Sequence, residues 1–181
     1  MFDKEYSFKG KHAKYVTLLT AEIGESKLKL FEKNIDVYAM AAVVGFCYNI
    51  RATKDNGTET TKIFTDAFNN NKSQIESNYR MIMLLHDKNN VSFDERVARA
   101  FKYDNNIEKR KTGDEIFDSY VLGGVEKIFE KIFDTLDATR AELDLDKEIR
   151  NLYSFLEEFE LRYQAKATDG DILNLCKYSY D

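Results

Sequence analysis

A run of apolar residues between Asp36 and Arg51 constrains the fold more than any other feature of this 181-residue chain. Wound as a helix, the run is apolar on nearly every side, which is typical of a helix that other helices surround. Its uncharged part is fourteen residues long, whereas a bilayer core requires about 20. We therefore expect a buried central helix over residues 34–51 and no membrane span.

Most of the remaining chain shows apolar residues at three- and four-residue spacing, the pattern of helices with one buried face. This spacing predicts helices over about 63–68, 73–87, 92–103, 114–134 and 144–167, and a short helix at 171–177. Residues 104–113 are polar and charged, and we expect a mobile loop there. Residues 53–61 also read as a polar loop. Residues 1–33 are compatible with short helices or a small hairpin, and helix is favoured.

These patterns predict an all-α fold: a compact single-domain bundle of six or seven helices around the apolar helix at 34–51. We expect helix to exceed ~60% of the chain, well above the globular average. Eight side chains at core spacing are expected to share one core: Tyr38, Val44, Phe46, Val121, Val125, Phe129, Leu152 and Leu156.

Three glycines lie inside the predicted helices, at Gly45, Gly123 and Gly124. Each glycine costs about 1 kcal/mol relative to Ala in a helix interior, so a structural reason for them is expected. Glycine lets a second backbone come close, because no Cβ stands between the two. We therefore predict a close crossing of the 34–51 and 114–134 helices.

Charge and cysteine content exclude several classes of function. The net charge is −5, which disfavours a general binder of polyanions. Cys47 and Cys176 both lie in apolar helical patterns, which indicates thiols rather than a disulfide framework. The N-terminus has no apolar segment of the kind that secretory signals carry. We expect a cytoplasmic protein of prokaryotic type.

Catalytic and metal-binding signatures are missing from the sequence. His12 and His86 have no His, Cys or carboxylate partner at a metal-ligand spacing, and no phosphate-binding glycine loop or nucleophile motif occurs. We expect no metal and no cofactor, and a non-enzymatic protein is favoured over an enzyme. An enzyme with acidic active-site residues in the bundle remains as a third possibility.

The C-terminal part of the chain suggests a protein interface. The apolar spacing of the 144–167 helix places seven residues on its core side: Leu145, Ile149, Leu152, Tyr153, Leu156, Phe159 and Tyr163. That register turns Phe155 outward, near Glu158 and other acidic residues. We predict that Phe155, Glu158, Tyr178 and Tyr180 bind another protein or a second copy of the chain, as in an accessory or regulatory subunit. The alternative is that the tail folds back onto the protein's own core.

Nucleic-acid binding is the second functional hypothesis. Basic residues gather in the N-terminal segment and along the 96–111 edge, as a phosphate-binding surface requires. Asp94 and Glu95 would bring negative charge to that edge, so this hypothesis ranks below protein binding. The candidate residues are Lys9, Lys11, Lys14, Arg96, Arg99, Lys102, Lys109, Arg110 and Lys111.

Overall fold

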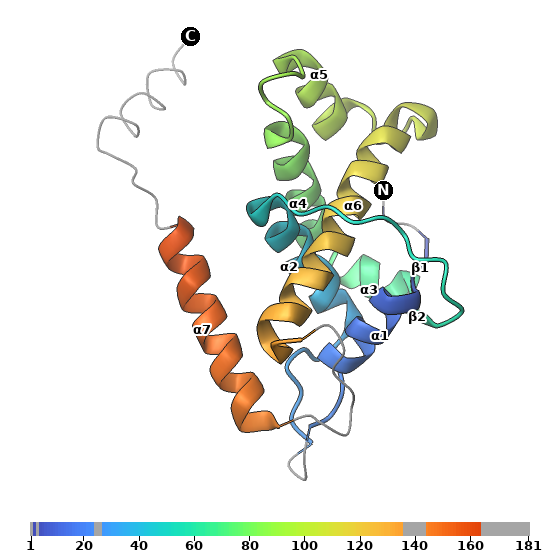
Figure 1. Cartoon of the computed structure of the whole chain (residues 1–181). Helices are drawn as coiled ribbons and strands as arrows, with labels where there is room; N and C mark the ends of the chain where they lie inside the picture. The colour runs from blue at the N-terminus through green and yellow to red at the C-terminus, as the bar shows by residue number, and fades with distance from the viewer. Residues whose placement is uncertain (1, 3, 24–26, 136–143, 164–181) are drawn as a thin grey trace.

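The computed structural model describes residues 2, 4–23, 27–135 and 144–163. Helix accounts for 67% of these residues, which confirms the predicted fold class (Figure 1). No helix in the described part is long and apolar enough to cross a membrane. The elements are β1 (Tyr6–Lys9), α1 (Gly10–Leu19), α2 (Asn34–Tyr48), β2 (Thr60–Ile63), α3 (Thr65–Asn70), α4 (Lys72–Leu85), α5 (Phe93–Val97), the π-helical turn η1 (Ala98–Lys102), α6 (Ile107–Phe133) and α7 (Leu145–Tyr163).

Helices α2 and α6 pack along each other through the middle of the bundle (Figure 1). A Cβ on Gly124 would overlap the backbone carbonyl of Ala41, and one on Gly45 would overlap that of Tyr120. A Cβ on Gly123 would meet the carbonyl of Ile50 in the same way. The two backbones are therefore in direct contact, and the predicted close crossing of these helices is confirmed.

The sheet is a feature that the sequence analysis did not predict. Strand β1 pairs antiparallel with β2, with Tyr6 opposite Ile63 and Lys9 opposite Thr60. Residues 51 to 57 positions apart thus form one ladder, and such a pairing leaves no local turn signal in the sequence. The 10–19 segment is helical, as expected, while Ile23 and Leu28 form an isolated bridge in place of a second helix.

Helix α6 begins earlier than the sequence analysis expected. Asn106 caps it, because the Asn106 side chain accepts a hydrogen bond from the N–H of Lys109 at 3.0 Å. One turn further on, Arg110 pairs with Asp114 at 3.0 Å, and such pairs four residues apart support a helix. The prediction of a mobile loop at 104–113 is therefore wrong for residues 107–113.

The core confirms most of the predicted residues. Tyr38, Val44, Val121, Val125 and Phe129 are buried, and Phe129 stacks on Tyr15 with 4.1 Å between the ring centroids. Phe46 and Leu152 are partly buried against the same core. Leu156 is exposed, and its placement in the core was wrong. Cys47 forms no disulfide within the described residues, and Cys176 lies outside them.

Candidate functional site: an open apolar face on helix α7

Helix α7 lies along the outside of the bundle and packs against α6 (Figure 1). Between residues 145 and 161, where burial is described, Phe155 (2% exposed) and Glu148 are the buried residues of α7. Leu152 and Phe159 are partly buried on the same side of the helix. The four positions follow one another at three- and four-residue spacing, so they form one face. The Phe155 ring lies 6.2 Å from that of Tyr48, which connects α7 to the end of α2.

This inward face differs from the predicted one, and the prediction that Phe155 points outward was wrong. The apolar residues of α7 cover a wide arc, since positions 145, 149, 152, 153, 155, 156 and 159 are all apolar. Spacing alone does not determine which part of a wide arc faces the bundle. Successive side chains point about 100° apart around a helix. Choosing Leu156 in place of Phe155 as the buried residue therefore turns the predicted inward face by one position.

The rest of the arc is uncovered. Ile149, Tyr153 and Leu156 are 46%, 63% and 47% exposed. They are four and three residues apart, so their side chains adjoin along one side of the helix. We call these three residues the open α7 face. A contiguous exposed apolar surface of this kind is typical of an interaction site.

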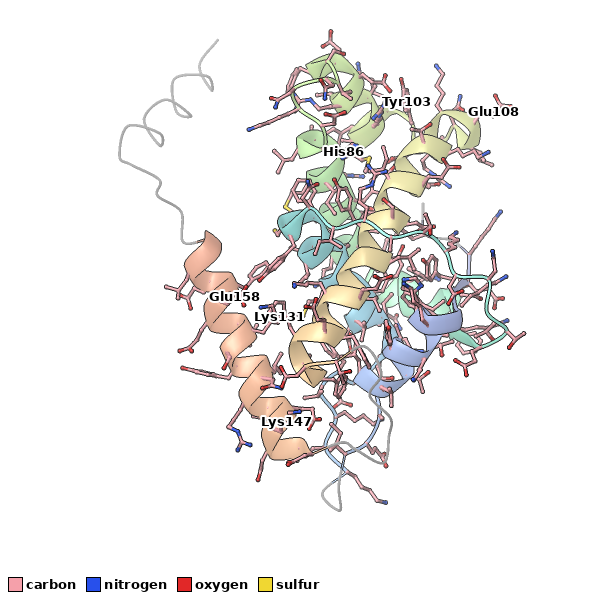
Figure 2. The ribbon with its side chains drawn as sticks, viewed as in Figure 1. His86, Tyr103, Glu108, Lys131, Lys147 and Glu158 are labelled. Atoms are coloured by element: carbon pink, nitrogen blue, oxygen red, sulfur yellow. The ribbon has the colours of Figure 1, made fainter. Side chains whose placement is uncertain are left out.

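Polar contacts hold α7 in this orientation. Glu158 of α7 and Lys131 of α6 point toward each other, 2.5 Å apart (Figure 2). Glu158 also accepts a hydrogen bond from the hydroxyl of Tyr48 at 3.1 Å. The hydrogen bond from Lys131 is the main reason that the pKa of Glu158 is lowered. Asn151 adds a third contact, because its side-chain amide donates to the carbonyl of Ile132 at 2.7 Å.

The structure therefore places the four predicted interface residues differently. Phe155 is buried, and Glu158 holds α7 to the bundle. Tyr178 and Tyr180 lie outside the described residues. Helical spacing did not predict the open α7 face, because it placed Ile149, Tyr153 and Leu156 on the core side.

Charged residues flank the open α7 face on the side away from α6. Arg150 and Glu157 directly follow Ile149 and Leu156 in the chain, so they lie on the same edge of the face. Both are exposed, and Arg150 makes no ion pair within the described residues. A hydrogen bond to Glu157 raises the pKa of Tyr153.

Two of the other exposed aromatic residues have cations over their rings. Phe93 of α5 and Phe101 of η1 are also solvent-exposed. The guanidinium of Arg96 lies 5.7 Å from the ring centroid of Phe93, and that of Arg80 lies 5.4 Å from that of Phe101. Cation–π contacts of this kind are favourable at exposed sites, and they account in part for these aromatic positions. The open α7 face has no such cover among the described contacts.

The predicted nucleic-acid residues do not form one surface. Lys9, Lys11 and Lys14 lie around α1, whereas the 96–111 residues lie around α5, η1 and the start of α6, at a distance from α1 (Figure 1). Most of these cations have partners inside the protein. Four of them form ion pairs: Lys11 with Glu126, Arg99 with Glu95, Arg110 with Asp114 and Lys111 with Glu115. Arg96 donates to two backbone carbonyls, and Lys109 lies over the ring of Tyr103. Lys9 and Lys102 are exposed.

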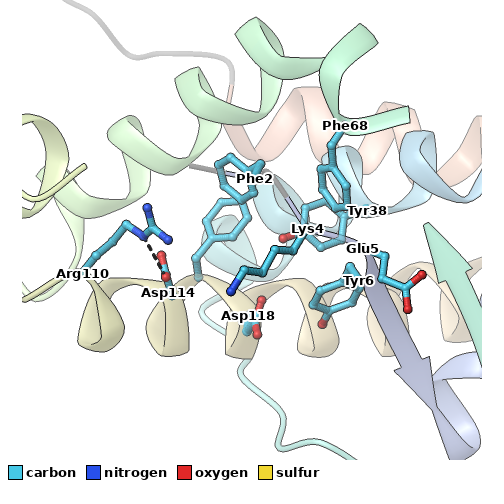
Figure 3. Close-up of a pocket in the computed structure, with 10 residues that line it drawn as sticks. Phe2, Lys4, Glu5, Tyr6, Tyr38, Phe68, Arg110, Asp114 and Asp118 are labelled. Carbon is cyan, nitrogen blue, oxygen red and sulfur yellow. Dashed lines mark hydrogen bonds and ion pairs between the residues drawn. The ribbon is translucent and has the colours of Figure 1, made fainter. Parts of the chain in front are cut away.

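A small cavity of about 200 Å³ lies between the N-terminal residues, α2 and α6 (Figure 3). Its wall is aromatic, with Phe2, Tyr6 and Tyr38 among the lining residues, and its rim has both signs of charge. Asp118 lies at this rim and pairs with Lys54 at 3.0 Å. Burial is the largest influence on Asp118 and raises the pKa of its carboxyl. The opposite charges at this rim largely balance one another, so they do not favour a ligand of one charge.

A second polar contact joins α1 to α6. His12 is fully buried, and its Nε2 lies 2.9 Å from Oε1 of Glu126. Because a carboxylate only accepts hydrogen bonds, Nε2 carries the proton and donates a hydrogen bond to Glu126. The other ring nitrogen, Nδ1, is buried without a hydrogen-bond partner among the described residues. The described part of the chain contains no group of three or more His, Cys, Asp or Glu residues arranged to hold a metal ion.

Burial of His12 gives the folding free energy a pH dependence. Burial is the dominant effect and lowers the pKa of His12, against the opposing influence of Glu126. At this residue, protons therefore bind the unfolded chain more readily than the folded one. The free energy of unfolding has its full value above the unfolded-state pKa of histidine, about 6.5, and falls as the pH drops below it. We expect His12→Gln to remove part of this dependence, at most about 1.4 kcal/mol per pH unit. Urea unfolding of both proteins between pH 7.5 and 5.5 measures the difference, and parallel curves would contradict the expectation.

Comparison with known proteins adds no relative, since no family model, no curated protein and no solved structure matches this chain.

Proposed function

We propose that this chain is a protein-interaction module, an accessory or regulatory subunit that binds a protein partner through the open α7 face. The observation that carries the proposal is the division of the α7 apolar arc. One part of the arc, around Phe155, packs on the bundle, while Ile149, Tyr153 and Leu156 stay exposed. Exposed apolar side chains are common singly, but a contiguous set on one helix face suits a partner helix or groove.

The composition of the open α7 face supports protein binding. Tyrosine is enriched in interfaces because its ring buries a large apolar area while its hydroxyl keeps a polar contact. Tyr153 occupies the middle of the face, between Ile149 and Leu156. Arg150 and Glu157 form a polar rim beside it. A central apolar group with a charged rim is the usual anatomy of a protein interface.

Nucleic-acid binding has less support. Counterion release requires several cations free to meet phosphates on one surface. In this chain, most of the predicted cations are engaged with acidic or carbonyl groups of the protein itself. The proposal is therefore limited to a protein partner.

The test is a double substitution of the open α7 face, Tyr153→Ser with Leu156→Ser. We expect the free energy of unfolding to change by less than about 1 kcal/mol, because both side chains are exposed. Association with the native partner, measured by sedimentation of the tagged full chain and its complexes from the native host, should be lost. The proposal is wrong if the complexes of the double variant and of the wild type sediment alike.

A matched control is available on the same helix. Leu161 is also exposed, but it lies about 80° from Tyr153, on the far side from Leu156. Leu161→Ser removes the same kind of apolar side chain without touching the open α7 face. We expect this control to keep wild-type association. Equal loss in the control would point to a general effect on α7.

A further inference from the structure

We infer that the partner at the open α7 face is a second copy of this chain, with the two α7 helices packed antiparallel about a two-fold axis. This inference rests on the proposed function and names its partner. Its basis is two pairings across the copies, of Tyr153 with Leu156 and of Arg150 with Glu157.

The spacing of the open α7 face suits a helix pair. Ile149, Tyr153 and Leu156 follow the alternating four- and three-residue spacing of a coiled-coil seam. A two-fold contact brings the same surface of both copies together. In an antiparallel arrangement centred between Tyr153 and Leu156, Tyr153 of each copy lies beside Leu156 of the other. The large ring then meets the smaller side chain twice, which favours close packing.

The charges beside the seam select the antiparallel direction. Arg150 and Glu157 lie on the same edge, one near each end of the open α7 face. In the antiparallel arrangement, Arg150 of each copy lies beside Glu157 of the other, giving two ion pairs. In a parallel arrangement, the same edges of the two copies lie on opposite sides of the seam, so neither ion pair would form. Arg150 has no ion-pair partner within the described residues, so it is available for this contact.

The length of the contact is limited. Asp146 and Glu160 are exposed acidic residues near the two ends of the same side of α7. The apolar seam between them spans about two helical turns. The area that so short a seam buries is less than the roughly 800 Å² per partner of a standard stable interface. We therefore infer a reversible dimer that depends on protein concentration.

Charge exchange tests this arrangement with the full-length chain. Arg150→Glu replaces both ion pairs by pairs of acidic residues, and Glu157→Arg replaces them by pairs of basic residues. Each single variant should weaken the dimer by about tenfold or more, because like charges across an interface cost several kcal/mol. An equimolar mixture of the two variants should associate like the wild type, since opposite charges face each other again. Sedimentation equilibrium at low salt measures each dissociation constant.

The controls separate this inference from the proposed function. Lys111→Glu makes the same change in net charge as Arg150→Glu, at an exposed position of α6, and should leave the dimer unchanged. A wild-type chain that is monomeric at all concentrations overturns the inference. It does so whether another protein or residues 164–181 of the same chain bind the open α7 face instead. Weakening without rescue in the mixture also overturns it. In both cases, the proposed function still stands if Tyr153→Ser with Leu156→Ser abolishes binding to a different protein.

Discussion

Gly124→Ala is expected to destabilise the protein by about 3 kcal/mol, at the upper end of the usual range for overpacking. The new methyl group would overlap the backbone carbonyl of Ala41, which belongs to the neighbouring helix α2. A backbone carbonyl inside a helix cannot rotate away, so α2 and α6 would have to separate. The gain of about 1 kcal/mol in helix propensity offsets only part of this loss. Urea unfolding followed by circular dichroism gives the free energy difference.

Gly113→Ala is the matched control, because it makes the same change in the same helix. There the new methyl group would meet the hydroxyl end of the Tyr79 side chain, and a side chain can shift more easily than a helix backbone. We expect the loss in unfolding free energy to be less than half that of Gly124→Ala. Equal losses at the two positions would show that the α2–α6 contact has no special role.

Phe155→Ala is expected to cost roughly 3–5 kcal/mol, as for other buried phenylalanines. The ring is buried beside Tyr48 of α2 and Phe159 of α7, so its removal leaves a cavity at the contact that holds α7. Leu156→Ala, one position further, should cost less than about 1 kcal/mol, because the side chain is exposed. Thermal and urea unfolding at a protein concentration low enough to avoid association compares the two. A larger loss of unfolding free energy for Leu156→Ala than for Phe155→Ala would contradict this expectation. It would show that Leu156 faces the bundle, as the apolar spacing predicted.

The glycine contacts between α2 and α6 and the register of α7 show what the sequence could and could not predict. Gly123 and Gly124 were informative because glycine inside an apolar helix is costly and demands a structural reason. The register of α7 was not determined, because its apolar residues span a wider arc than one contact covers. The choice between Phe155 and Leu156 depends on Tyr48 and Lys131, which belong to other helices.

Contacts between distant parts of the chain account for the other differences. The β1–β2 ladder joins Tyr6 to Ile63, and a partly buried hydrogen bond joins His12 to Glu126, 114 residues apart. Neither pair has a spacing that a local pattern can detect. The early start of α6, by contrast, had a local signal in Asn106 as an N-cap, which the charged residues after it obscured.

The direct backbone contact between α2 and α6 also affects how the protein opens. Two helices without side chains between them at the crossing cannot slide past one another by small rotamer changes, so they are expected to separate in one step. Within the part of the chain that the structure describes, helix α7 is attached to the bundle on one side, through Phe155, Glu158 and Asn151. Units attached in this way can detach at a lower free energy than global unfolding. We therefore expect a pair of helices that open together and an outer helix, bearing the open α7 face, that detaches more readily.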